Sequence, residues 1–280
     1  MSSPLAGAYV RIAEPHEYSE AAWILTRGFA QDPCMNWFGS VKTMIPAYRD
    51  IPDYDAHPAA AKRALKNLHI FQTALTQATI LSGGFITVAV IPNSNEDATQ
   101  EAGTASGAAP GEIIAGATLW LRPGQPLDFP LSTIIRSGIW RVLRGWGLTG
   151  VKRVLLDFSP QVEKTLEKGF KARNLDRLDS WHLLEMSVDP QYQDKGLGSL
   201  MMKDGFERTS PKPVHLEATT AKSRDIYAHY GFEIDEEHSF GRSAVNEQGL
   251  AVDSKDAAMG YPEWIMTKWN YDSANQGTES

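Results

Sequence analysis

The chain has 280 residues, which is long enough to bury a full hydrophobic core without disulfide bonds. Hydrophobic residues make up 42% of it and charged residues 22%, ordinary globular values that exclude a wholly disordered, collagen-like or coiled-coil chain. The 27 Lys and Arg residues against 34 Asp and Glu residues give a net charge of -7. An acidic chain is poorly suited to general nucleic-acid binding, because neutralising phosphates requires a basic face.

Several other classes of protein are also disfavoured. No apolar run approaches the length of a membrane span, and residues 1–8 lack the pattern of a signal peptide. The single cysteine, Cys34, excludes an internal disulfide and a cysteine-rich zinc site. We therefore expect a cytoplasmic protein with no metal and no nucleic-acid partner, whose oligomeric state the sequence does not indicate.

Hydrophobic periodicity predicts strands and helices along most of the chain. Asp32-Pro33 is expected to end the first long helix, and the segment 35–54 is expected to be irregular apart from one short helix. The predicted elements, in chain order, are a strand over 9–13, a helix over 17–31, a helix from 58 to about 82, strands over 85–91 and 113–121, a helix over 151–172, a strand over 181–190, a helix from about 200, a strand over 214–219 and a helix over 222–230.

Two segments are predicted to lie outside the regular structure. Residues 92–112 are rich in Asn, Ser, Ala, Gly, Thr and Pro, and are expected to form a long flexible hairpin loop. The tail 273–280 is expected to be disordered for the same reason. The remaining residues, 1–272, contain no convincing linker and are interpreted as one domain with a helical insertion at about 125–175.

The insertion contains an unusual basic stretch, residues 131–153, with five Lys or Arg residues and no acid. Trp140 and Trp146 are interspersed among these basic residues. One interpretation is a surface for membranes or anionic ligands. The other, which we favour, is a set of helices whose tryptophans pack in a core while the arginines stay solvated, because Gly145, Gly147 and Gly150 interrupt any long amphipathic helix.

The most informative stretch joins a predicted strand to a predicted helix. The strand over 181–190 ends in Asp189-Pro190, and Gln193-Asp194-Lys195-Gly196-Leu197-Gly198-Ser199 leads into the next helix. Helix N-termini present unpaired N–H groups, and glycines allow the backbone to approach a phosphate closely. Neither the P-loop pattern nor the dinucleotide pattern G-x-G-x-x-G is satisfied, since residue 201 is Met.

This stretch resembles the GNAT superfamily of acetyl-CoA-dependent acetyltransferases, whose fingerprint is [QR]-x-x-G-x-[GA] after a strand ending in V-x-P. Gln193 to Gly198 match the fingerprint, and the second family motif is found in the strand 214–219 followed by Tyr227 and Gly231-Phe232. Within the superfamily the chain is most similar to puromycin acetyltransferase and its relatives, firmly over about 181–270, faintly over 9–38, and not over 92–112 or 125–175. The resemblance implies an α/β fold with a mixed, strongly bent sheet, flanked by helices and splayed after its fourth strand.

The resemblance also implies a cosubstrate and a direct mechanism. Acetyl-CoA is expected in the splay, with its pantetheine arm along the backbone of Met186, Ser187 and Val188 and its pyrophosphate on the amides of residues 193–199. Tyr227 occupies the position of the family's general acid, and Glu217 and Glu185 are candidate bases or amine-binding carboxylates, with salt bridges as the alternative. Ser223 stands where the family often has Asn, and Asp194 adds an acid to the phosphate loop.

The acceptor is expected to be the amine of a small molecule, such as a drug or toxic metabolite. Its pocket is predicted to have Phe29, Asp32, Trp37 and Phe38 on one side and the hairpin over about 238–262 on the other. Two alternatives stay open: a protein or peptide N-acetyltransferase, and a non-catalytic acyl-CoA-binding module. The histidines are interpreted as structural or exposed, because they lack a metal-ligand spacing.

Overall fold

The computed structural model describes residues 5–93, 111–125, 129–254 and 256–269. Most of the predicted hairpin loop (94–110) and the whole predicted tail (273–280) lie outside the described residues.

Among the described residues, seven strands form one mixed sheet in the order β1-β2-β3-β4-β5-β7-β6. In this sheet β4 and β5 pair in parallel, and the other described neighbours pair antiparallel. The strands are β1 (Tyr9–Ile12), β2 (Phe85–Pro92), β3 (Glu112–Leu121), β4 (Trp181–Val188), β5 (Val214–Ala218), β6 (Glu233–Phe240) and β7 (Tyr261–Lys268).

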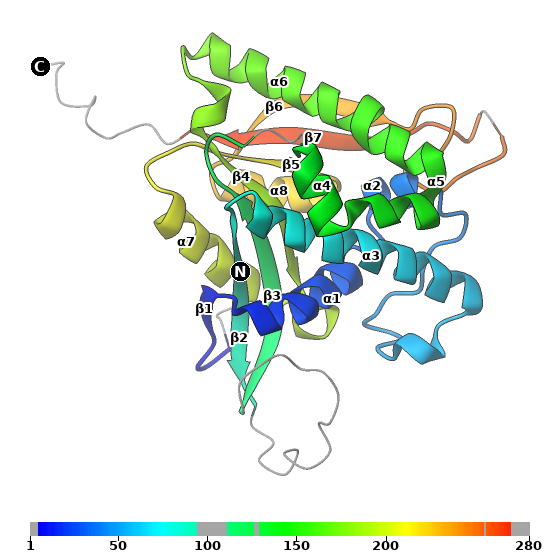
Figure 1. The fold of residues 1–280 in the computed structure, drawn as a ribbon, viewed down its shortest axis with the longest axis horizontal. Helices are drawn as coiled ribbons and strands as arrows, with labels where there is room; N and C mark the ends of the chain where they lie inside the picture. Colours follow the sequence, from blue (N-terminus) through cyan, green and yellow to red (C-terminus); the bar gives the residue numbers. More distant parts are fainter. Residues whose placement is uncertain (1–4, 94–110, 126–128, 255, 270–280) are drawn as a thin grey trace, which may run out of the picture.

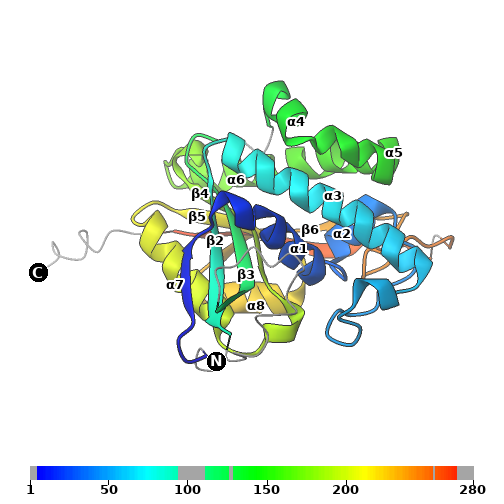
Figure 2. The same cartoon turned by 60° about the horizontal axis from the view of Figure 1, so that its bottom comes forward.

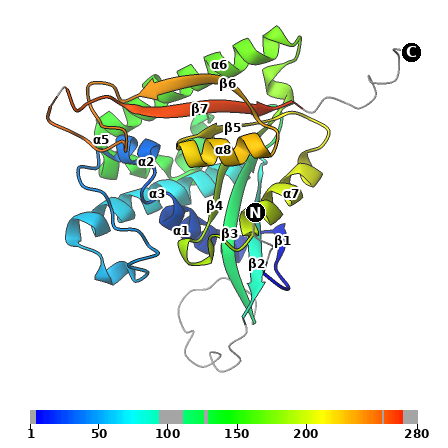
Figure 3. The same ribbon diagram turned by 180° about the vertical axis from the view of Figure 1, so that it is seen from behind.

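The parallel pair separates almost as soon as it forms. Trp181 pairs with Val214 and His182 with His215, and there the described pairing between β4 and β5 ends. Strands β5 to β7 then run across the direction of β1 to β4, so the sheet is bent at this point (Figure 1; Figure 3). The expected mixed, bent sheet splayed after its fourth strand is therefore confirmed.

Helices cover both faces of the sheet. They are α1 (Tyr18–Gly28), α2 (Pro33–Gly39), α3 (Ala59–Leu81), α4 (Leu131–Ser137), α5 (Val142–Lys152), α6 (Ser159–Ala172), α7 (Leu197–Thr209) and α8 (Ala221–His229). The largest core cluster lies between the sheet and α1, α2 and α3, and a second lies between the sheet and α7 and α8 (Figure 2). Within the described residues, none of the helices combines the length and the apolar character that a bilayer crossing requires.

The prediction for Asp32-Pro33 was wrong, because this dipeptide begins a helix. Helix α1 ends earlier, at Gly28, and the side chain of Asp32 accepts a hydrogen bond of 3.0 Å from the backbone N–H of Met35. Asp32 is thus the N-cap of α2, and Pro33 occupies the first turn, where its missing N–H costs nothing.

The segment predicted as an insertion contains α4, a 3-10 turn (Ile139–Arg141), α5, a short π-helical stretch (Arg153–Phe158) and α6. Trp146 is buried in the main core cluster, which agrees with the favoured interpretation. Trp140, however, is 43% exposed, and the guanidinium groups of Arg141 and Arg144 lie 5.7 and 5.4 Å from the centre of its ring. The helix α5 is interrupted at Gly147, whose φ of 65° is in the left-handed region.

Candidate active site

The loop that leaves β4 is tied back to the end of that strand. The side chain of Asp189 accepts from the backbone N–H of Gln191 at 3.1 Å, and Gln193 Nε2 donates to the carbonyl of Val188 at 3.2 Å. Gly196 precedes α7 with a φ of +73°, a conformation that favours glycine. These bonds hold the first amides of α7 at the mouth of the gap between β4 and β5.

Gly198, in the first turn of α7, is not required by the packing of the protein itself. A Cβ atom at this position would meet only Met186 Cε, at an ordinary 3.7 Å. The glycine instead leaves the backbone open on its cleft side, which suits close approach by a ligand such as a phosphate. Gly196, Leu197, Gly198 and Ser199 all line the large cleft described below.

The acid in this loop is paired. Arg49 Nη2 lies 2.9 Å from Asp194 Oδ2, and this hydrogen bond holds the pKa of the carboxyl below its ordinary value. The Arg49 guanidinium also offsets the negative charge that Asp194 brings to the loop. Lys195 is exposed, lies 5.2 Å from the centre of the Tyr192 ring, and is not among the residues that line the cleft.

The end of β4 presents a backbone edge to the cleft. Met186, Ser187 and Val188 pair with β3 on one side, and on the other side no strand is hydrogen-bonded to them in the part of the chain that the structure describes. All three residues line the cleft. Their free edge can accept an added extended chain, such as an amide-bearing ligand arm.

Glu185 is buried on the same strand, beside a bulge. The register between β3 and β4 shifts at Leu184, so Leu184 and Glu185 both face the side of the sheet that α1 and α3 cover. Leu184 packs against the main core cluster. The Oε1 atom of Glu185 accepts a hydrogen bond of 3.0 Å from Gln72 Nε2 of α3. The second oxygen of Glu185, Oε2, has no hydrogen-bond partner among the described residues. Burial raises the pKa of this carboxyl to about 8, with a smaller contribution from the negative charge of Asp32.

Glu217, on β5, faces β4 across the splay. Its Oε2 lies 2.9 Å from His182 Nε2, and its Oε1 has no partner among the described atoms. The ring of His182 also stacks on that of His215, with 4.4 Å between the ring centres. The interpretation of these histidines as structural therefore fits His215, whereas His182 contacts a candidate site residue.

Glu263, on β7, is a further carboxylate that the sequence analysis missed. It is fully buried, its Oε2 accepts from the hydroxyl of Tyr261 at 2.9 Å, and its Oε1 has no partner within the described protein. Burial, reinforced by the nearby charges of Glu217 and Asp32, raises the pKa of Glu263 well above its ordinary value. The signal in the sequence was an acid directly before the apolar run Trp264-Ile265-Met266.

Tyr227 lies on α8 and reaches the cleft from the opposite core cluster, where it packs against Phe232. Burial, together with Glu217 and Asp32, raises the pKa of its hydroxyl to about 12, so the phenol stays protonated at neutral pH. Ser223, one turn earlier, forms a reciprocal capping box with Thr220, and its hydroxyl accepts from the Thr220 backbone N–H at 3.2 Å.

These residues share one cleft of about 1390 Å³. It extends from the loop at 193–199 along β4, past the carboxylates of Asp32, Glu185, Glu217 and Glu263, to side chains of the insertion. Asp32 is held by two contacts, since Oδ1 caps α2 and Oδ2 accepts from the hydroxyl of Thr219. Burial raises the pKa of Asp32.

The predicted acceptor pocket needs two corrections. Phe29, Asp32 and Phe38 line the cleft, but Trp37 does not: it is 3% exposed and packs between Phe38, Phe240 and Tyr261. The second wall is formed by residues 129–159 of the insertion, and no described residue of the predicted hairpin, about 238–262, lines the cleft. The hairpin lies elsewhere because residues 241–251 fold against α2, where Asn36 Nδ2 donates to the carbonyl of Gln248.

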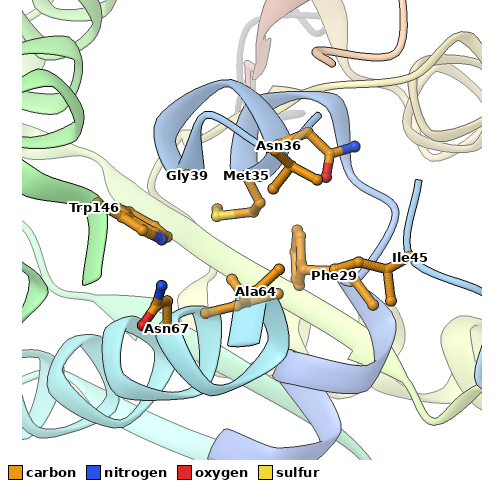
Figure 4. Close-up of a pocket in the computed structure, with 11 residues that line it drawn as sticks. Phe29, Met35, Asn36, Gly39, Ile45, Ala64, Asn67 and Trp146 are labelled. Carbon is orange, nitrogen blue, oxygen red and sulfur yellow. The ribbon is translucent and has the colours of Figure 1, made fainter. Parts of the chain in front are cut away.

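A second, much smaller pocket lies between α2, α3 and α5 (Figure 4). Its volume of about 20 Å³ has room for little more than one water molecule. We therefore place the candidate site in the large cleft. No group of three or more His, Cys, Asp or Glu side chains suited to a metal ion occurs among the described residues.

No protein family model matches the chain. A curated relative, an uncharacterised N-acetyltransferase of Schizosaccharomyces pombe, is 33% identical over 121 residues, which is 42% of this chain and 47% of the relative. The match thus spans about half the length of the relative. This similarity to a protein named as an N-acetyltransferase agrees with the GNAT likeness of the two motifs at 193–198 and 227–232.

Two chains of solved structures that this chain matches over most of its length are described as acetyltransferases. An HPA2-type histone acetyltransferase and related acetyltransferase from Corynebacterium glutamicum is 20% identical, with 94% of this chain and 97% of that chain covered and a TM-score of 0.48. Arylalkylamine N-acetyltransferase 2 from Aedes aegypti is 15% identical, with 94% and 98% covered and a TM-score of 0.48.

The two stretches that carry the GNAT likeness are connected in space. The hydroxyl of Tyr230, on α8, donates to Ser199 Oγ in the first turn of α7 at 2.7 Å. This bond fixes the helix that bears Tyr227 relative to the loop that bears Gly196 and Gly198.

Proposed function

We propose that the protein transfers an acetyl group from acetyl-CoA directly to the amine of a small molecule. One observation carries the proposal: a single cleft contains the glycine loop at the start of α7, the unpaired edge of β4, three carboxylates with a free oxygen, and the hydroxyl of Tyr227. Those are the groups needed to hold a phosphorylated thioester beside a cationic amine.

The cosubstrate would bind in the splay. Backbone N–H groups from Gln193 to Ser199 would hold the pyrophosphate, aided by the positive end of the α7 dipole. Lys222, which lines the cleft at the start of α8, would add a positive side chain for the CoA phosphates. The pantetheine amides would pair with the free edge of Met186, Ser187 and Val188. Ser223 lines this end of the cleft, but its hydroxyl already takes part in the α8 capping box.

The acceptor must lose its proton before it attacks. A free amine is an ammonium ion at neutral pH, and Glu217, oriented by His182, would bind it through its unpartnered Oε1. Burial raises the pKa of Glu185 to about 8, so its ionised form is a much stronger base than an exposed glutamate. That form, which predominates above about pH 8, would accept the ammonium proton.

The transfer itself then requires no covalent enzyme intermediate. The amine nitrogen attacks the thioester carbonyl carbon, the C–N bond forms, and the C–S bond breaks as CoA leaves as a thiolate. Tyr227 would donate its phenolic proton to that thiolate and recover a proton from solvent after product release. The nitrogen loses a second proton to solvent as the amide forms, which balances the proton that Tyr227 recovers. The proton on Glu185 is also lost to solvent, so the reaction yields the N-substituted acetamide, free CoA and one proton.

A small acceptor is favoured over a protein substrate by the insertion. Residues 129–159 form a wall of the cleft beside the carboxylates, which leaves the site deep and flanked by helices instead of open along a surface. A peptide segment of a protein substrate would need an open groove where residues 129–159 form this wall.

Thiol release measures the proposed reaction. The full chain, given acetyl-CoA and a panel of primary amines, should release CoA only with an amine present, and mass spectrometry should find the acetylated amine. Calorimetry should find CoA binding with one site. Binding of CoA without acetylation of any amine or peptide would instead support a non-catalytic acyl-CoA-binding module, and acetylation of peptides alone would support a peptide N-acetyltransferase.

A further inference from the structure

The part of the cleft beyond the carboxylates is an apolar chamber made largely by the insertion. Phe129, Trp140, Leu143, Leu155 and Phe158 line it, from the start of α4 to the end of the π-helical stretch. Trp140, Leu143 and Leu155 are 43%, 41% and 46% exposed, so these large apolar side chains are not covered by the rest of the described protein. Uncovered apolar surface in a concave site is typical of a ligand pocket.

The facing wall of the chamber is also apolar. Helix α2 contributes Phe38, whose ring meets that of Phe158 edge-on at 5.4 Å, and helix α3 contributes Phe71 and Leu75. Helices α4 and α5 lie along α3 (Figure 2). Residues of all three helices line the chamber, so it is bounded by helices on both sides.

The acidic end of the cleft adjoins this chamber directly. Gln72 follows Phe71 on α3 and donates to Glu185. The same turn of α3 therefore contributes Phe71 to the chamber wall and Gln72 to the buried carboxyl group of Glu185. The free oxygens of Glu185, Glu217 and Glu263 are buried, and a buried oxygen without a partner is costly unless a ligand supplies a donor.

The five basic residues of the stretch 131–153 do not line the cleft. Arg136, Arg141, Arg144 and Lys152 are exposed, and Arg153 donates to the carbonyl of Trp37 and to the hydroxyl of Ser40. Among the described lining residues the one basic side chain is Lys222, at the start of α8. The unpartnered buried oxygens thus favour a ligand that donates hydrogen bonds, such as an ammonium group, and the chamber beyond them favours an apolar group.

We propose that the substrate is an amphiphilic primary amine, with one ammonium group held by Glu185, Glu217 and Glu263 and a long aliphatic or polycyclic body in the chamber of the insertion. This inference rests on the proposed function and specifies its substrate class. It also gives a role to the insertion, a segment over which the resemblance to puromycin acetyltransferase does not extend. The body of the substrate would cover Trp140, Leu143 and Leu155.

The experiment compares linear amines that differ only in their tails. The probes are n-butylamine, n-hexylamine and n-octylamine, with 1,8-diaminooctane as the matched control that has the same length and a second charge. Each buried methylene should raise kcat/KM roughly fourfold. The diamine should be at least tenfold poorer than n-octylamine, because its far ammonium would be buried in an apolar wall.

Two neighbouring residues provide matched variants. Leu155 lines the chamber, whereas Leu156, 67% exposed on the same helical stretch, does not. Leu155→Asn should lower the ratio of kcat/KM for n-octylamine over n-butylamine by fivefold or more. Leu156→Asn should leave that ratio at the wild-type value, and both variants should melt close to the wild type because both side chains are substantially exposed.

Distinct results overturn the inference and the proposed function. Equal kcat/KM across the series, or a preference for the diamine, would overturn the amphiphilic substrate while leaving amine acetylation intact. A preference for dodecanoyl-CoA with n-butylamine would assign the chamber to a long acyl chain and would also overturn it. If no amine is acetylated, the proposed function fails, and calorimetry with n-octylamine still decides the inference: binding weakened by Leu155→Asn supports it, and no binding overturns it.

Discussion

His182 Nε2 and Glu217 Oε2 lie 2.9 Å apart, and this contact joins β4 to β5 where their backbone pairing ends. The contact therefore spans the start of the splay and fixes the Glu217 carboxylate at the floor of the cleft. It leaves Oε1 of the same carboxylate free to receive a donor.

Glu217→Gln tests this carboxylate as the amine-binding group. The amide retains the volume and can still bond to His182, but it lacks the charge that attracts an ammonium ion. We expect kcat/KM for the amine to fall about 10- to 100-fold, in line with a charged hydrogen bond of ~1.5–3 kcal/mol, while calorimetry gives an unchanged Kd for CoA. An unchanged KM for the amine would show that Glu217 is only a structural partner of His182.

Gly198→Val tests the phosphate loop. The structure has room for a side chain here, with Met186 Cε 3.7 Å from a Cβ, so the variant should fold. The added methyl groups would project to the cleft side and keep a pyrophosphate from the backbone amides. Calorimetry should find CoA affinity reduced by at least tenfold, with a smaller loss for Gly198→Ala. A folded Gly198→Val protein with wild-type affinity for CoA would contradict the loop assignment.

Much of this fold follows from local pattern. The helix α3 and strands β2 to β5 were predicted within a few residues, because their periodicity or β-branched runs match how deeply they are buried. The Asp32-Pro33 pair shows the limit of such signals. An Asp followed by Pro is compatible with a helix end and with a helix start, and only the chain after it decides.

The site was harder to predict than the fold. The fingerprint at 193–198 and the motif around Tyr227 indicated the loop and α8, but Gln72 and Glu263 come from a helix and a strand with no motif at those positions. The role proposed for the insertion could not be predicted from local sequence pattern either, because the same apolar residues fit a core helix or a pocket wall. Its place beside α3 depends on tertiary packing.

Glu185 gives the protein a pH dependence that can be isolated. Its pKa is about 8 in the folded state against 4.5 ordinarily, so the native state binds this proton more tightly than the unfolded state. Protonated Glu185 makes its full contribution to the free energy of unfolding below about pH 4.5, and this contribution is lost as the pH rises to about 8. Glu185→Gln keeps an acceptor for Gln72 and cannot ionise.

Denaturation in urea at pH 5 and pH 8 measures the effect. The free energy of unfolding of Glu185→Gln minus that of the wild type should be larger at pH 8 than at pH 5. The increase should be up to about 4 kcal/mol, at 1.36 kcal/mol per pH unit. Comparison with the wild type removes the contributions of Glu263 and Asp32, which are present in both proteins. The same difference in stability at both pH values would mean that Glu185 ionises normally in the folded protein.

Tyr227→Phe tests the proton donor. The substitution removes only the oxygen, and the ring keeps its contact with Phe232, whose centre lies 5.7 Å away. With a pKa of about 12, the phenol is protonated throughout the range in which enzymes are assayed and can donate to a departing thiolate. General acid catalysis contributes about 10²–10⁴-fold, so the single-turnover rate should fall by that factor while CoA affinity stays near the wild-type value.

A matched substitution at Tyr54 shows whether the loss of rate is specific to the hydroxyl of Tyr227 or follows the removal of another tyrosine hydroxyl as well. Tyr54 donates to the carbonyl of Lys62 at 3.1 Å and does not line the cleft, so Tyr54→Phe should change stability slightly and leave the transfer rate unaltered. Single-turnover measurement is required because slow product release would hide a change in the chemical step. If Tyr227→Phe transfers acetyl groups at the wild-type single-turnover rate, then water or another group protonates the thiolate, and Tyr227 only packs α8 against Phe232.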